Sequence, residues 1–205
     1  MENALSKREQ SKEEKRKKIL QAARKVFIEK GYHSTSISDI IRQTDLARGT
    51  FYLYFRDKQE IFDELVNELF QAITRHVNML DLDKLESEQD LYHNLEITVQ
   101  HLFDTLMKHR EIAHIVLSTP FGTDSDFDKK IEAHHEMLFQ VATVIFRKAV
   151  EKGILNADPV LLSHLVLGGM KEIVFQWIVK GRYEGDMKKE VREIVRIYMK
   201  GAQNR

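Results

Sequence analysis

The chain has 205 residues, 42% of them hydrophobic, with two prolines and no cysteine. This apolar content suits a packed core and excludes a wholly disordered protein. Without cysteine, neither a disulfide nor a thiolate metal site can form, which fits a reducing compartment. No apolar run reaches the roughly 20 residues that cross a bilayer, and the polar first 18 residues lack a signal peptide's apolar stretch. We therefore expect a cytoplasmic protein without membrane contact.

The formal net charge is zero, but the charges are unevenly distributed along the chain. Residues 1–56 hold 13 Lys and Arg against 7 Asp and Glu, a balance of +6, so the remaining residues carry −6. A basic segment joined to an acidic one is typical of a protein that meets a polyanion at one end. A solvated, lysine-rich first helix explains the charge alone equally well.

Apolar residues recur at helical spacing from the first segment onward. The first predicted helix, which Gly31 ends in a left-handed cap, carries Ile19, Leu20, Ala23, Val26 and Phe27. Ser36 and Asp39 have the spacing of a capping box and predict the start of a short helix. After a turn at 46–47, a second short helix runs through 49–54. Asp57 is the expected cap of a longer helix that extends to about residue 77.

The second part of the chain also follows the helical period. Residues 81–90 are polar and predict a loop, and 120–122 predict another. Asp158 before Pro159 has the sequence of a helix start. The further helices are expected at 91–106, 111–117, 131–149, 159–179 and 191–198. No stretch shows sustained period-two alternation.

The predicted fold class is therefore all-α, with about nine helices. We expect a polar tail at 1–10, a helix-turn-helix domain at 11–60 and an effector-binding and dimerisation body at 61–205. Residues 37–56 read ISDIIRQTDLARGTFYLYFR, two short helices joined by a tight turn. Short helices are unstable alone, and in a helix-turn-helix the second one enters the major groove of DNA.

The residues around the second short helix resemble the signature of the TetR family of repressors. The strings that carry the resemblance are GTFYLYF at 49–55 and DKQEI at 57–61, preceded by VF at 26–27, GY at 31–32, TSI at 35–37 and DII at 39–41. The resemblance covers about 15–65, and the C-terminal half fits only loosely, through KGIL at 152–155 and DP at 158–159. The string DLA at 45–47 departs from the family, where Gly, an aliphatic residue and Ser are commoner, which puts one phosphate contact in doubt.

The resemblance implies a dimeric repressor whose effector shifts the first and fourth helices. The chemistry of the residues fits DNA contact: Arg48 suits a guanine edge or a phosphate, Gly49 permits close backbone approach, and hydroxyls suit phosphate oxygens. The predicted DNA contacts are Thr35, Ser36, Ser38, Arg48, Gly49, Thr50, Tyr52, Tyr54 and Lys58. Phe51 and Phe55 are expected to anchor the recognition helix. The alternative is that the aromatic residues are ordinary core and the cations ordinary surface.

The body carries aromatic and sulfur-containing side chains that either fill a core or line an effector pocket. The candidates are Phe103, Met107, His109, His114, Phe121, Phe139 and Trp177. Such a pocket favours a hydrophobic ligand, and the two histidines and the tryptophan are candidates for its polar contacts. The charge of −6 disfavours a strongly anionic ligand unless Lys108 and Arg110 offset it. Long-chain acyl compounds and aromatic drugs both fit.

Residues 159–179 are apolar nearly all round, so this helix must be covered on two sides. It either forms the centre of a monomer core or packs against a second subunit, with Gly168 and Gly169 permitting close approach. We favour the homodimer, because two recognition helices read a palindrome through two-fold spacing.

The rival interpretation is an iron-binding helical protein. Glu111 with His114, and Glu132 with His135, have the Glu-x-x-His spacing of di-iron sites. Chance supplies such pairs in a chain with nine histidines, and these two flank a Pro-Gly loop. No nucleophile, base and orienting group stand out together. We therefore expect no enzyme activity, cofactor or metal, and the partners are operator DNA, a small effector and a second copy. The sequence does not show whether the effector releases or promotes DNA binding.

Overall fold

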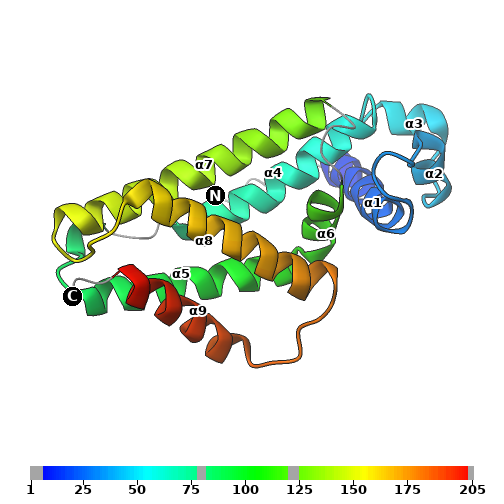
Figure 1. Cartoon of the computed structure of the whole chain (residues 1–205). Helices are drawn as coiled ribbons and strands as arrows, with labels where there is room; N and C mark the ends of the chain where they lie inside the picture. The colour runs from blue at the N-terminus through cyan, green and yellow to red at the C-terminus, as the bar shows by residue number, and fades with distance from the viewer. Residues whose placement is uncertain (1–6, 78–81, 120–124, 203–205) are drawn as a thin grey trace.

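The computed structural model describes residues 7–77, 82–119 and 125–202, and in these ranges the secondary structure is entirely helical (Figure 1). The α-helices of these ranges are α1 (Lys7–Lys30), α2 (Ile37–Arg42), α3 (Arg48–Tyr52), α4 (Lys58–Val77), α5 (Glu88–Lys108), α6 (Arg110–Ser118), α7 (Ser125–Glu151), α8 (Pro159–Val174) and α9 (Met187–Ala202). A 3-10 turn at Leu82–Lys84 precedes α5, and a π-helical turn at Phe175–Val179 extends α8. The prediction of an all-α fold with about nine helices is confirmed.

Helices α1, α2 and α3 form one end of the molecule, which we call the head, and α5 to α9 form the body (Figure 1). Helix α4 begins beside the head and runs along the body, so the predicted division at residue 60 falls within its first turn. The predicted polar tail at 1–10 is too long, because α1 already begins at Lys7. Charged side chains favour a solvated helix when opposite charges are four residues apart, as Glu13 and Lys17 are.

The predicted helix starts are confirmed by their hydrogen bonds. Asp57 Oδ1 accepts from the backbone N–H of Glu60 at 2.8 Å, and Asp158 Oδ1 accepts from that of Leu161 at 2.7 Å. Gly31 follows α1 with a φ of +79°, the left-handed conformation in which glycine carries no steric penalty. These local signals therefore fix where α4 and α8 begin and where α1 ends.

The predicted loop at 81–90 is wrong at its end, since α5 begins at Glu88. The side chain of Ser87 accepts from the backbone N–H of Asp90 at 3.1 Å, and Ser87 Oγ donates to the Asp90 carboxylate at 2.7 Å. Polar residues therefore build the first turn of this helix, where acidic side chains also complement the helix dipole.

The head is anchored to the body by aromatic rings from three segments. Phe127, in the first turn of α7, is 2% exposed and stacks on Phe62 of α4 with a centroid distance of 4.7 Å. Its ring also lies 5.6 Å from that of Tyr32, which sits between α1 and α2. Beside this cluster, Lys130 of α7 pairs with Asp63 of α4 at 3.0 Å. A movement of α7 relative to α4 would therefore disturb the backbone that leads into α2.

Gly169 of α8 packs against α9 of its own chain. A Cβ at Gly169 would lie 1.9 Å from the hydroxyl oxygen of Tyr198, and that hydroxyl donates to the carbonyl of Leu165 at 3.2 Å. The expectation that Gly169 permits a close approach between subunits is therefore wrong, because the space is filled within the monomer. A Cβ at Gly168 would meet open space.

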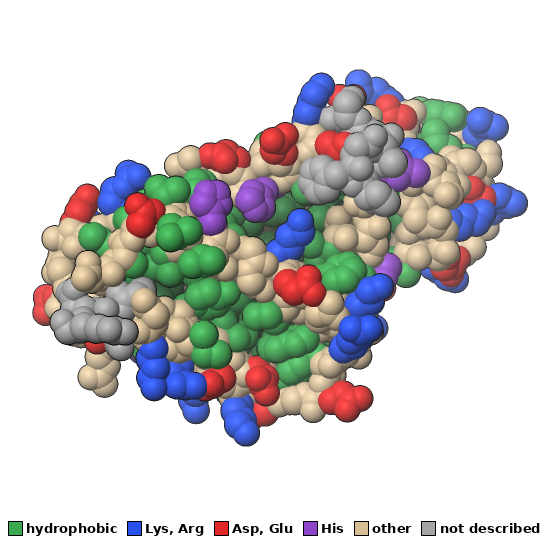
Figure 2. Space-filling model, in the orientation of Figure 1, with side chains coloured by type: hydrophobic (Ala, Val, Ile, Leu, Met, Phe, Trp, Pro, Cys, Tyr) green, Lys and Arg blue, Asp and Glu red, His purple; other side chains and the backbone are tan. Residues whose placement is uncertain are grey.

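Hydrophobic side chains gather on the face over α7 and α8 (Figure 2). Val144 is 51% exposed, Leu161 59% and Leu165 56%. A contiguous exposed apolar face on a folded domain is typical of a protein-protein contact. None of the described helices is long and apolar enough to cross a membrane.

Candidate DNA-reading surface and effector site

Four of the predicted contacts lie on α3, whereas Tyr54 follows the helix by two residues and packs partly against the core. Arg48, Gly49 and Tyr52 are exposed, and Thr50 and Tyr54 are half-buried. A Cβ at Gly49 would have no atom within 4 Å, so the backbone can approach a flat partner closely there.

The opposite side of α3 faces the core. Phe51 and Phe55 are 0% and 1% exposed, with their ring centroids 6.4 Å apart. Burying two phenylalanines fixes both the position and the rotation of a helix only five residues long. They form the anchor that the sequence predicts for the recognition helix.

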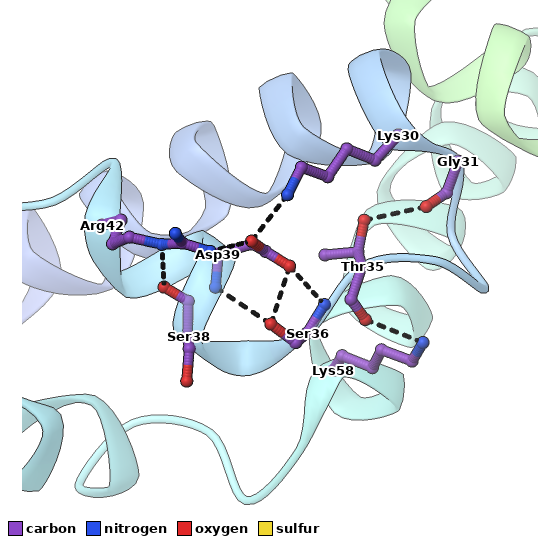
Figure 3. Close-up of polar contacts among 8 residues, drawn as sticks. All are labelled: Lys30, Gly31, Thr35, Ser36, Ser38, Asp39, Arg42 and Lys58. Atoms are coloured by element: carbon purple, nitrogen blue, oxygen red, sulfur yellow. Dashed lines mark hydrogen bonds and ion pairs between the residues drawn. The ribbon is translucent and has the colours of Figure 1, made fainter.

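A carboxylate fixes the start of α2 (Figure 3). Asp39 Oδ2 accepts from the backbone N–H of Ser36 at 3.0 Å and from its hydroxyl at 2.7 Å, which completes the predicted capping box. Asp39 Oδ1 accepts from Lys30 Nζ at 2.7 Å and contacts the guanidinium of Arg42. The hydrogen bonds from Lys30, and then those from Ser36, hold the pKa of Asp39 far below its usual value.

The side chains of Thr35 and Lys58 bond to backbone carbonyls of the head (Figure 3). The Thr35 side chain is buried and its hydroxyl donates to the carbonyl of Gly31 at 2.8 Å. Contact between this hydroxyl and a phosphate, as predicted, does not fit that placement. Lys58 Nζ donates to the carbonyls of Tyr32, His33 and Thr35, each at 2.9 Å. An ammonium has three donors, so contact with a phosphate would exchange one of these bonds.

Ser36 and Ser38 remain on the surface of the head beside two arginines that the prediction omits. The Arg42 side chain is 71% exposed, with its Nε donating to the carbonyl of Ser38 at 3.3 Å. Arg56, just after α3, is 85% exposed and pairs with Glu60 at 3.3 Å. The excess of basic residues in 1–56 could have indicated both arginines as DNA contacts, although neither belongs to a motif.

The predicted effector residues do not share one cavity. Phe103 is fully buried and its ring lies 5.0 Å from that of Trp177, so these two do meet. Phe139 stacks on His164 at 4.4 Å, between α7 and α8, and Met107 is 41% exposed. Phe121 lies outside the described residues.

Of the two predicted histidines, His109 lies at the junction of α5 and α6 and His114 lies within α6, both near the head. His109 Nδ1 is 3.6 Å from Glu68, but burial lowers the pKa of His109 more than this carboxylate raises it. Glu68 also pairs with Arg24 of α1 at 2.6 Å. His114 lines a hollow of about 200 Å³ between α6 and the end of α1. Both histidines therefore belong to the joint between head and body.

A separate hollow of about 40 Å³ lies inside the body, among α5, α7, α8 and α9. Its lining is Leu95, Val99, Phe146, Leu162, Val166, Met170, Ile194, Val195, Tyr198 and Met199. This volume is far below the roughly 300–1,000 Å³ of a typical ligand pocket. The hollow therefore marks an apolar seam between helices rather than a formed ligand pocket.

Within the described residues, no group of three or more His, Asp or Glu side chains is arranged to hold a metal ion. The two Glu-x-x-His pairs lie on different helices, with Glu111 and His114 on α6 and Glu132 and His135 on α7. Glu111, Glu132 and His135 are exposed. Nothing in this arrangement favours a di-iron site.

Two family models match the chain. Residues 19–65 match "Bacterial regulatory proteins, tetR family", and residues 93–199 match "Tetracyclin repressor-like, C-terminal domain". The uncharacterized HTH-type transcriptional regulator YvdT of Bacillus subtilis is 32% identical over 148 residues, which cover 70% of this chain and 69% of that protein.

Solved structures share the fold over most of the chain. A putative TetR-family transcriptional regulator from Syntrophomonas wolfei has a TM-score of 0.72 and 26% identity, covering 92% of this chain and 94% of the other. The regulator FadR of Bacillus subtilis, in complex with stearoyl-CoA, has a TM-score of 0.72 and 21% identity, covering 90% and 97%. With both of its parts matched in order, the chain belongs to the TetR family of bacterial transcriptional regulators.

Proposed function

We propose that this protein is a cytoplasmic repressor that binds a palindromic operator as a homodimer and is released from it by a small hydrophobic effector. The observation that carries this proposal is the double role of α4. Its first residue, Lys58, holds the backbone that leads into α2, while the rest of the helix packs in the body. A change of packing in the body is therefore transmitted to the head through one rigid element.

Proposed contacts with DNA use the outer surface of the head. Ser36 and Ser38 lie at the start of α2, where backbone N–H groups and hydroxyls suit phosphate oxygens. The proposed contacts on and just after α3 are Arg48, Gly49, Thr50, Tyr52 and Tyr54. Lys58 supports this surface mainly through its three carbonyl partners rather than as a free clamp.

Two observations support a hydrophobic effector. The interior hollow is lined by aliphatic and aromatic side chains with no ionised group, and the similar FadR structure contains stearoyl-CoA. At about 40 Å³ the hollow is far too small for an acyl chain, so the effector must bind a more open body. A ligand shifts an equilibrium only by its preference for one state, so an effector that needs the open body would favour that state. DNA is released if, in the dimer with the open body, the two heads no longer have the spacing of the half-sites.

The test is fluorescence anisotropy with duplexes selected from a random pool by the full-length protein. Affinity should fall steeply with salt, with a log–log slope near −0.9 per phosphate contacted. Stearoyl-CoA should release the duplex and raise the melting temperature with concentration, whereas free coenzyme A should do neither. Release by 1-naphthol instead would favour an aromatic effector. If the protein binds no duplex, or if only small charged metabolites release it, the proposal fails.

A further inference from the structure

One apolar side chain projects from the end of the recognition helix. Leu53, the residue after α3, is 77% exposed, more than any other large hydrophobic side chain within 9–75, 83–119 and 126–201. Its backbone N–H donates to the carbonyl of Thr50 at 3.2 Å, and its φ of −75° and ψ of −16° are helical. The position of Leu53 is therefore set by the helix, although its side chain is not packed in the core.

A single exposed leucine is ordinary on a protein surface, but the surroundings of Leu53 are not. Tyr52 beside it is 45% exposed, and no atom lies near the open face of Gly49. Arg48 precedes this apolar strip and Arg56 follows it, both exposed. The strip therefore lies between two cations on the basic part of the chain, which complements a polyanion that also displays apolar groups.

We propose that Leu53 reads thymine, through van der Waals contact with the C5-methyl group in the major groove. This inference rests on the proposed binding of DNA by α3. The thymine methyl is the apolar group on the base edges of that groove, and a leucine side chain has no hydrogen bond to offer a phosphate. Contact with the methyl removes apolar surface of both partners from water. Leu53 thereby adds specificity for an A·T pair at one position of each half-site.

The test replaces single thymines of the selected operator by deoxyuridine, which removes only the methyl group. At one thymine per half-site, the substitution should weaken binding by the wild type about three- to fourfold, the effect of one buried carbon. Leu53→Ala should bind the thymine and deoxyuridine duplexes equally at that position, while Leu53→Met should retain the discrimination. Ile97→Ala, which truncates a 41% exposed residue of α5, serves as the control and should also retain it.

The inference is overturned if the wild type binds its operator but discriminates at no thymine, or if Leu53→Ala discriminates as the wild type does. Either result leaves operator binding itself intact, so the proposed function would survive. A wild type that binds no duplex would remove both proposals together.

Discussion

At the scale of single residues, the connection between α1 and α2 is held from two sides. Asp39 ties the start of α2 to Lys30 at the end of α1, and Lys58 ties the intervening carbonyls to α4. Charged hydrogen bonds of this kind are shorter and stronger than neutral ones. The surface that presents Ser36 and Ser38 is therefore positioned before any DNA is bound.

Asp39→Asn tests the first of these ties through its dependence on pH. The folded state lowers the pKa of Asp39 below its unfolded value of 3.8, so the carboxylate stabilises the fold above that pH. The stabilisation is lost as pH falls toward the folded pKa. The variant should melt below the wild type at pH 7, and the gap should narrow below about pH 3.8. Melting curves followed by circular dichroism measure both, and a gap independent of pH would contradict the assignment.

Lys58→Met tests the second tie. Methionine keeps much of the aliphatic stem but removes the ammonium donor from three carbonyls, of which that of Tyr32 keeps a second donor, the backbone N–H of Thr35. An unsatisfied buried polar group costs about 1–3 kcal/mol. We expect the free energy of unfolding to fall within that range and amide exchange to increase in residues 32–36. If Lys58 acted only as a phosphate clamp, operator affinity would fall without any change in stability or exchange. Urea unfolding and hydrogen exchange distinguish these outcomes.

The two ties differ in how far they could be predicted from the sequence. Ser36 and Asp39 are three residues apart, so one helical turn brings them together and their spacing alone predicts the capping box. Lys58 lies 23 to 26 residues after the carbonyls it binds, and no local pattern encodes such a pairing. The sequence therefore indicated Lys58 as a cation near DNA but not its partners within the protein.

At the scale of whole helices, periodicity predicts where elements form but not which of them meet. The long apolar segment after Pro159 is covered on one side within the monomer, while Leu161 and Leu165 are exposed, so cover on a second side stays a prediction. Its cover includes α9, through the hydroxyl of Tyr198 that sits over Gly169. Chain order cannot distinguish a neighbour within the monomer from one in a second subunit, because both would present the same apolar face. The scatter of the effector candidates has the same cause. Periodicity assigns residues to helices, but it does not show whether those helices converge on one cavity, and here they do not.

Gly169→Ala and Tyr198→Phe together test this contact. Alanine at an exposed helical site would stabilise the protein by about 1 kcal/mol, but here its methyl group collides with the Tyr198 hydroxyl. That hydroxyl is the far end of a half-buried side chain, which can turn away at the cost of its hydrogen bond to Leu165, about 0.5–1.5 kcal/mol. Gly169→Ala alone should therefore gain little or no stability. In the double variant the hydroxyl is absent, and a favourable coupling of about 1 kcal/mol is expected from the double-mutant cycle. Additive single effects in urea unfolding would show that the two positions do not touch.

At the scale of the whole molecule, the basic head and the acidic body have different proposed functions, DNA binding and dimerisation. The +6 head draws the protein to DNA, while the apolar face of α7 and α8 is the surface proposed to join two copies. Half-sites one helical turn apart are about 34–36 Å from centre to centre, a spacing that one chain with one α3 cannot read. This division follows from the charge distribution and from the exposed apolar area. Both are sums over many residues, so an error of a few residues in a predicted helix end does not change them.

Leu161→Glu tests the proposed interface with little risk to the monomer. Leu161 is 59% exposed and its backbone N–H is bonded to the Asp158 cap. Glutamate in the first turn of a helix is favoured by the helix dipole, so α8 should remain intact. In a two-fold interface the change would bury two carboxylates, each at a cost of several kcal/mol if unpaired. We expect a wild-type dimer at micromolar concentration and a dissociation constant raised at least about 100-fold, equivalent to roughly 2.7 kcal/mol.

Sedimentation equilibrium of both proteins measures this shift, and Ile97→Glu on α5 is the matched control. Ile97 is also an exposed apolar residue, at 41%, but belongs to α5 rather than to α7 or α8, so its variant should sediment as the wild type does. Operator affinity should fall with dimerisation in Leu161→Glu alone, because a single head forfeits half of the palindrome's contacts. A monomeric wild type would remove the dimer from the proposal. If Leu161→Glu remains a dimer with unchanged operator affinity, the interface does not include the first turn of α8.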